Sequence, residues 1–588
     1  MSASRTHVAG LALMALICAA PHGAAAAPSD VPAVPVSLTG QTLETVGTLA
    51  VLHNGRVKPF DSFAREIVSL LAGEPHVGRQ DPVATLLAIG ADPSAWADAR
   101  ILSVPFRPLR EALELEPRAT HVSYNQLVET RRVMRMLPPI IEKQERDEKL
   151  SMLEQEALDL FDRFTVFTKM MQADVRLVPP ATPGSVEWRS VLETPLKTAW
   201  EQFFEAIRQG DAGRVQGLAR EFRTVARDTN PSAWPPEWRI RLELFYHHAR
   251  PLAAARAIYG AAILLFLLML WSPAGKPAAP EKPRPVRGDI PPPLAAGTTG
   301  RAPGQSRGPM AGWRRRGMGS AALSLVTAAA VVHAAGIAMR VVIGGRPPVS
   351  NFYETMLWLP FVGVVLAIIF EMIYRTGFFG FSAAILAGAT LLLADYVPLD
   401  ASISPVVAVL RSNLWLTVHV LTIVGSYGAL ALATVLAHVY GVQYCLRAGP
   451  ETLRALALHL YRTIQVGVVM LAGGIMLGAV WANASWGRYW GWDPKETWAL
   501  ITLLWFIAVL HGRFAGWLTG VGVALSTIAG FFLLLMTYYG VSFYLVGLHS
   551  YSGGHAKPLP TLLIAYLIAE IVFIALVGLR ALRRSPAS

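Results

Sequence analysis

Nine apolar runs, most of them about 20 residues long, dominate this chain of 588 residues. An α-helix of that length spans the ~30 Å hydrocarbon core of a bilayer. The runs lie near 251–272, 318–339, 355–373, 377–397, 415–444, 463–482, 497–511, 518–545 and 560–579. With 53% hydrophobic and 16% charged residues, the chain is neither a single soluble domain nor a disordered polymer. We predict an all-α polytopic membrane protein with about nine transmembrane helices.

The first 250 residues follow a different pattern. Residues 1–27 combine a basic start, a short apolar run and a small-residue end, which predicts a signal segment, whether or not it is cleaved. Residues 28–250 hold no membrane-length run and predict a mostly helical, exported (extracytoplasmic) N-terminal domain. Within it, segment 53–61 is typical of a turn with Asn54-Gly55 at its apex, followed by a helix.

A basic, proline-rich linker, 273–317, separates the first span from the other eight. It contains ten prolines and nine Lys/Arg residues against two acidic ones, which predicts a cytoplasmic segment. Helix alternation then gives the inside loops 17 Lys/Arg and the outside loops after the linker six. This bias explains the net charge of +12 without nucleic acid and predicts a multi-pass protein of the cytoplasmic (inner) membrane.

Tryptophan is concentrated in one predicted outer loop, 481–498. Residues 481–505 hold six of the sixteen tryptophans. An interfacial aromatic belt explains one or two of them, whereas an exposed group of indole faces suits a large, flat, apolar ligand. The candidate binding residues are Trp486, Gly487, Trp490, Trp492 and Asp493.

The end of this loop also has a purely structural interpretation. Asp493, Pro494 and Glu496 have the order of an N-cap, a first helical residue and the third residue of a capping box. The segment is therefore expected to open the next span and to hold the tryptophans against it.

Two histidines are predicted on the same surface as the tryptophans. His419 lies one turn into its span from the outer end, and His549 follows the 518–545 span. Either one alone is more typical of a hydrogen-bonded structural histidine, but the pair flanks an indole-rich loop. Haem b, stacked on indoles and held by two axial imidazoles, is the simplest ligand that accounts for all three features.

Three further histidines are candidates within the membrane. His511 lies near the predicted inner leaflet, where an ionisable residue suggests function; it is either a residue at the helix end beside Arg513 or the ligand of a second haem site. His333 and His438 are possible mates, and the mate could also belong to another polypeptide.

These motifs closely resemble the CcsA (ResC) family of cytochrome c biogenesis proteins. The resemblance rests on the tryptophan loop, on the three histidines 419, 511 and 549, and on Pro347-Pro-Val-Ser-Asn-Phe-Tyr-Glu354. It covers about 318–588, the predicted haem-handling transmembrane domain. The shorter tryptophan signature alone is shared with the CcmC and CcmF relatives.

The resemblance implies the WWD domain of a system II cytochrome c synthetase, a haem lyase that acts on haem b as its substrate. His419 and His549 match the two external iron ligands of the family, and His511 matches its second transmembrane ligand. The implied partners are a CcsB (ResB)-type membrane protein, an apocytochrome c with a CxxCH segment and a thioredoxin-like thiol reductant. The first transmembrane histidine of fused relatives has no equivalent here, so the partner should supply it.

Three other functions stay open at this point. A dihaem b-type electron-transfer subunit would bury its paired histidines inside the bilayer. A haem exporter would deliver haem without attaching it. A polytopic transporter would use the aromatic loop as a lid, although its predicted spans contain few of the acidic residues that mark ion relays.

Overall fold

A computed structural model of the protein describes residues 31–35, 38, 40–146, 148–182, 185, 187–271, 318–397, 399–405, 413–549 and 559–583. The predicted signal segment 1–27 and the predicted linker 273–317 lie outside the described residues.

The N-terminal part is mostly helical, as predicted, with two small antiparallel sheets that pair β1 with β2 and β3 with β4. Its elements are α2 (Gln41–Gly47), β1 (Ala50–His53), β2 (Arg56–Pro59), α3 (Phe60–Ala72), α4 (Pro82–Ala91), α5 (Pro93–Asp98), β3 (Leu102–Ser103), α6 (Arg107–Ala112), β4 (His121–Val122), α7 (Tyr124–Thr130), α8 (Arg132–Glu145), α9 (Met152–Met171), η1 (Val191–Glu193), α10 (Lys197–Arg208), α11 (Ala212–Thr229) and α12 (Glu237–Ala249). One apolar core joins these helices except α12, whose buried Ile240 and Tyr246 belong to two smaller clusters.

In the part of the chain that the structure describes, nine helices are long and apolar enough to cross a membrane, which confirms the predicted class. They comprise α13 (Pro251–Trp271, continuous with α12 as a span), α14 (Met318–Gly344), α15 (Phe352–Tyr374), α16 (Phe378–Tyr396), α17 (Asn413–Cys445), α18 (Pro450–Trp486), α19 (Pro494–Phe514), α20 (Gly520–Leu535) and α22 (Thr561–Leu582). A single turn of π-helix, η4 (Met536–Gly540), called the π-turn below, and the short α21 (Val541–Tyr544) extend α20.

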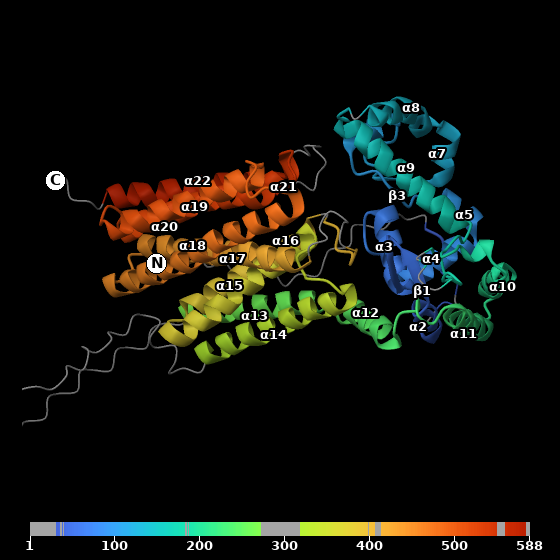
Figure 1. Ribbon diagram of the computed structural model, residues 1–588, viewed down its shortest axis with the longest axis horizontal. Coiled ribbons are helices and arrows are strands. Elements are labelled where there is room, and N and C mark those ends of the chain that lie inside the picture. The colour runs from blue at the N-terminus through green and yellow to red at the C-terminus, as the bar shows by residue number, and fades with distance from the viewer. Residues whose placement is uncertain are drawn as a thin grey trace, which may run out of the picture.

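Helix α17 lies near the middle of this bundle and packs against α15, α18 and α20. The N-terminal domain lies beyond one end of the bundle, on the side where α12 and α21 are found (Figure 1). Whichever way the bundle is inserted, the domain and that end of the helices therefore face the same side of the membrane.

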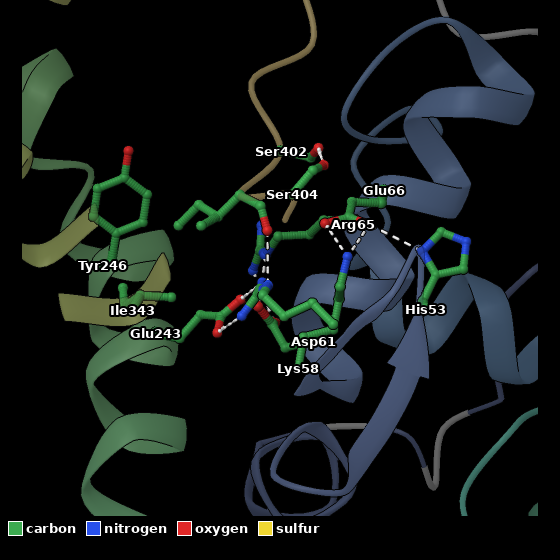
Figure 2. A network of polar contacts seen from close by, with 12 residues as sticks. His53, Lys58, Asp61, Arg65, Glu66, Glu243, Tyr246, Ile343, Ser402 and Ser404 are labelled. Carbon is green, nitrogen blue, oxygen red and sulfur yellow. Dashed lines mark hydrogen bonds and ion pairs between the residues drawn. The ribbon is translucent and has the colours of Figure 1, made fainter. Parts of the chain in front are cut away.

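The predicted Asn54-Gly55 turn joins the N-terminal domain to the bundle. Both residues have positive φ angles, 48° and 71°, which a two-residue hairpin of this type requires, and α3 follows at Phe60, as predicted. Arg56 then donates two hydrogen bonds to Glu243 of α12, at 2.7 and 2.6 Å, and a third to the carbonyl of Ile403, at 2.7 Å. Figure 2 shows Glu243 beside the polar network that continues to Lys58 of the hairpin.

Ile403 belongs to the loop 399–405 between α16 and α17, and other arginines hold the same loop. Arg340 donates to the carbonyl of Ala401 at 3.0 Å, and Arg346 donates to that of Ser404 at 2.6 Å. Glu354, on the first turn of α15, forms ion pairs with both arginines. The loop that leads towards α17 is thus fastened to the N-terminal domain and to α15.

Candidate functional site

A pocket opens between the starts of α15, α17 and α19, the end of α18, and the π-turn η4 with the chain that follows it. Its empty space, including the open mouth, is about 860 Å³. Both His419 and His549 line it, together with Trp490. Most other lining side chains are apolar or aromatic, for example Phe352, Ile423 and Tyr427.

His419 is held by helix α18. Its Nδ1 lies 2.9 Å from the carbonyl oxygen of Gly474, and its ring is nearly parallel to that of Trp481, at 10° and 6.1 Å between centroids. A carbonyl only accepts hydrogen bonds, so Nδ1 carries the proton and Nε2 presents a lone pair. This tautomer suits a metal ligand.

Gly478 leaves the space that this imidazole occupies. A Cβ at that position would come within 2.6 Å of Cε1 of His419, whereas a Cβ at Gly473 would meet nothing within 4 Å. We expect Gly478→Ala to displace the ring and to weaken haem binding about tenfold or more, the effect typical of disturbed ligand orientation. Gly473→Ala, on the same helix, should bind haem like the wild type in a spectral titration. Equal affinities for the two variants would contradict this role for Gly478.

His549 is held by a carboxylate. Its Nδ1 lies 2.9 Å from Oδ1 of Asp493, whose Oδ2 also accepts from the backbone amide of Leu548. Burial alone would raise the pKa of Asp493, but the hydrogen bond and charge of His549 and the backbone amides of Lys495 and Leu548 outweigh it and lower that pKa. Asp493 therefore stays ionised at neutral pH. A carboxylate on Nδ1 orients an imidazole and makes its Nε2 a better iron ligand.

Asp493→Asn should weaken haem binding roughly 10- to 100-fold, because the imidazole loses its charged partner while asparagine still caps α19. Glu496→Gln is the matched control. Glu496 also lines the pocket, but among the described residues it accepts only from the backbone amides of Gly491 and Asp493, so its neutral form should cost much less affinity. If the two variants lose the same amount, the carboxylate does not act through His549.

The predicted tryptophans occupy different places. Trp490 lines the pocket. Trp486 contacts the ring of His549 edge to face at 5.2 Å. Trp492 is 69% exposed, has a φ of 55° and meets only Trp490 among the ring contacts described. Gly487 ends α18 in the left-handed conformation. Among the predicted tryptophans, Trp486 contacts one of the two histidines and Trp490 lines the pocket with both of them.

The predicted capping box is confirmed. Asp493 accepts from the amide of Lys495, and Glu496 accepts from the amide of Asp493 at the start of α19. Asp493 thus both caps the helix and orients His549.

The other candidate histidines lie elsewhere. His511, near the end of α19, bonds the carbonyl of Ile507 and is exposed. Both ring nitrogens of His438 are engaged, by the carbonyl of Thr434 and by Glu570, each at 2.8 Å. His333 is fully buried, and neither of its ring nitrogens has a hydrogen-bond partner in the described chain. The structure brings neither His333 nor His438 into contact with His511.

Sequence reasoning did not single out Trp481, Lys495 or Tyr538 as site residues. Trp481 lies against His419, and the other two line the pocket. The sequence does contain a signal near Trp481. Gly474 and Gly478 are four residues apart, a spacing that predicts close approach of two membrane helices one turn before Trp481. No local pattern points to Tyr538, because it reaches the pocket through a π-turn.

Similarity to known proteins covers the part of the chain that forms this pocket. The Cytochrome C assembly protein family matches residues 349–549, which include both pocket histidines. The chain is 38% identical over 240 residues to protein NrfI of Wolinella succinogenes, over 39% of its own length and 26% of that relative. The chain thus spans about a quarter of the length of NrfI.

Two shorter relatives are covered over more than three quarters of their length. The CcsA protein of Prochlorococcus marinus subsp. pastoris is 35% identical over 246 residues, 36% of this chain and 77% of that protein. The CcsA protein of Guillardia theta is 34% identical over 264 residues, 40% of this chain and 85% of that protein. The chain is therefore a multi-pass membrane protein of cytochrome c biogenesis and belongs to the cytochrome c assembly protein family.

Proposed function

We propose that this protein carries haem b to the pocket and attaches it there to the CxxCH thiols of an apocytochrome c, as the haem-handling part of a system II synthetase. One observation carries the proposal. Two imidazoles line a single pocket, each with Nδ1 bonded to an acceptor and Nε2 without a hydrogen bond in the described chain. Two such nitrogens suit the axial positions of one haem iron.

The attachment itself needs no acid or base from the protein. Each cysteine S–H adds across a vinyl C=C bond: sulfur bonds one carbon, hydrogen bonds the other, and nothing leaves. The role of the chain is to hold haem in one orientation while the thiols approach. The histidine of CxxCH then replaces one of the two pocket imidazoles on iron.

The predicted topology indicates on which side of the membrane the reaction occurs. The N-terminal domain shares one end of the bundle with the pocket, and the predicted signal and basic linker favour the exported side for that domain. His511 lies sixteen residues along α19 from Lys495, about 24 Å at 1.5 Å per residue. We propose that it belongs to the entry site for haem and that a CcsB-type partner supplies the second ligand.

The proposal keeps the predicted division of the chain. Residues 28–250 form the extracytoplasmic domain, 251–272 the first span, 273–317 the cytoplasmic linker and 318–588 the haem-handling domain. A thioredoxin-like reductant would keep the CxxCH thiols reduced, because only thiols add to the vinyl groups.

Co-expression tests the proposal. The chain is produced with a CcsB-type partner and an apocytochrome c, and haem that resists acid extraction is measured on the cytochrome. Covalent haem that disappears when both CxxCH cysteines are changed to serine supports the synthetase. Free haem on the exported side without attachment would instead indicate an exporter, and haem that stays bound to the chain would indicate an electron-transfer subunit.

A further inference from the structure

The pocket contains a lysine without an acidic partner. Lys495, the second residue of α19, lines the pocket, and its Nζ donates to the carbonyl of Tyr538 at 3.2 Å and to Oγ of Ser542 at 2.8 Å. Among the described residues, no carboxylate lies within ion-pair distance of this ammonium. Two neutral acceptors therefore hold a cation beside a mostly apolar cavity.

The two nearest acids in the sequence are committed elsewhere. Glu496 accepts from the amides of Gly491 and Asp493, and Asp493 accepts from His549 and from two backbone amides. An ammonium has three N–H donors, and the described chain uses two of those of Lys495. One donor therefore stays available for a ligand.

The position of this ammonium is set by a second element. Tyr538 lies in the π-turn η4, and such turns are frequent at functional sites. The neighbouring Thr537 bonds Thr502 and the carbonyl of Trp498, so the turn is fastened to α19. Ser542 also donates to the carbonyl of Tyr538. The acceptors that hold Lys495 are therefore held in place themselves.

We propose that Lys495 binds a propionate carboxylate of the haem, an inference that rests on the proposed function. Haem is apolar except for its iron and two propionates at one edge. In this pocket the imidazoles would bind the iron, and the aromatic side chains would pack against the macrocycle. Lys495 would bind the anionic edge.

This contact orients the substrate. The two vinyl groups lie on the part of the macrocycle away from the propionates, so a propionate at Lys495 turns the vinyl groups away from the start of α19. The CxxCH thiols must then approach from the side of the pocket opposite Lys495. Lys495 is thus a positioning residue for the attachment.

The test compares haem with its dimethyl ester, in which both propionates are uncharged. Purified full-length protein is titrated with each, and binding is followed by the absorption spectrum of the bis-imidazole iron. We expect the wild type to bind haem about tenfold or more tightly than the ester, the usual strength of a charge-assisted hydrogen bond. Lys495→Met should bind both with the affinity of the ester, and Lys495→Arg should keep most of the preference.

Lys197→Met is the matched control, because Lys197 is exposed on the N-terminal domain; it should keep the wild-type preference. Equal binding of haem and ester by the wild type, or an unchanged preference in Lys495→Met, would overturn the inference and leave the proposed function intact. A wild type that binds neither compound with an iron–imidazole spectrum would overturn both. The wild-type comparison gives an answer even if Lys495→Met does not fold.

Discussion

Replacing His419 or His549 with alanine is expected to abolish the bis-imidazole spectrum of bound haem. Each change removes one of the two imidazoles that line the pocket and have Nδ1 bonded to an acceptor. Because disturbing only the partner of such a ligand costs roughly 10- to 100-fold, loss of the ligand itself should weaken haem binding by more than about a hundredfold. Absorption spectra of the purified variants measure the loss, and added imidazole should partly restore the spectrum by filling the vacated space.

His248→Ala is the control for this pair. His248 is exposed on α12 and, within the described part of the chain, bonds only the carbonyl of Leu244, so its loss should leave the spectrum unchanged. His511→Ala should keep haem in the pocket when haem is added to purified protein, but should lower haem loading in cells. An unchanged spectrum in either His419→Ala or His549→Ala would refute the proposed iron site.

Replacing Arg56 with alanine should strongly destabilise the protein. The side chain of Arg56 is 9% exposed and that of Glu243 is 2% exposed. Without Arg56, Glu243 becomes a buried charge without its partner, which typically costs about 3–5 kcal/mol. Pulse proteolysis of the full-length protein in increasing urea measures the change in the free energy of unfolding.

Arg107→Ala is matched to this change, since Arg107 also pairs with a glutamate but is 75% exposed. An exposed pair contributes about 0–1 kcal/mol. The double variant Arg56→Met, Glu243→Met should recover much of the stability lost in Arg56→Ala, because both charges leave the interior together. If Arg56→Ala is no less stable than Arg107→Ala, the contact does not hold the domain to the bundle.

Features that depend on one stretch of chain were predictable from the sequence. The nine spans follow from the length and polarity of each run. The Asn54-Gly55 turn and the capping box of Asp493 and Glu496 also form as predicted, because each satisfies its backbone within a few residues. The histidine pair was predicted from the order of the spans, which puts His419 and His549 on the same surface as the tryptophan loop.

The sequence alone thus determined the class of protein, its local turns and caps, and the residues to consider for haem. The tertiary structure decided how they are used. Nδ1 of His419 bonds the carbonyl of Gly474, and Trp492 is exposed. Lys495 donates to a carbonyl of the π-turn, and Arg56 joins the N-terminal domain to loop 399–405. These contacts join segments distant in sequence. They depend on how each helix is rotated and how closely it approaches its neighbours, and side-chain packing sets both.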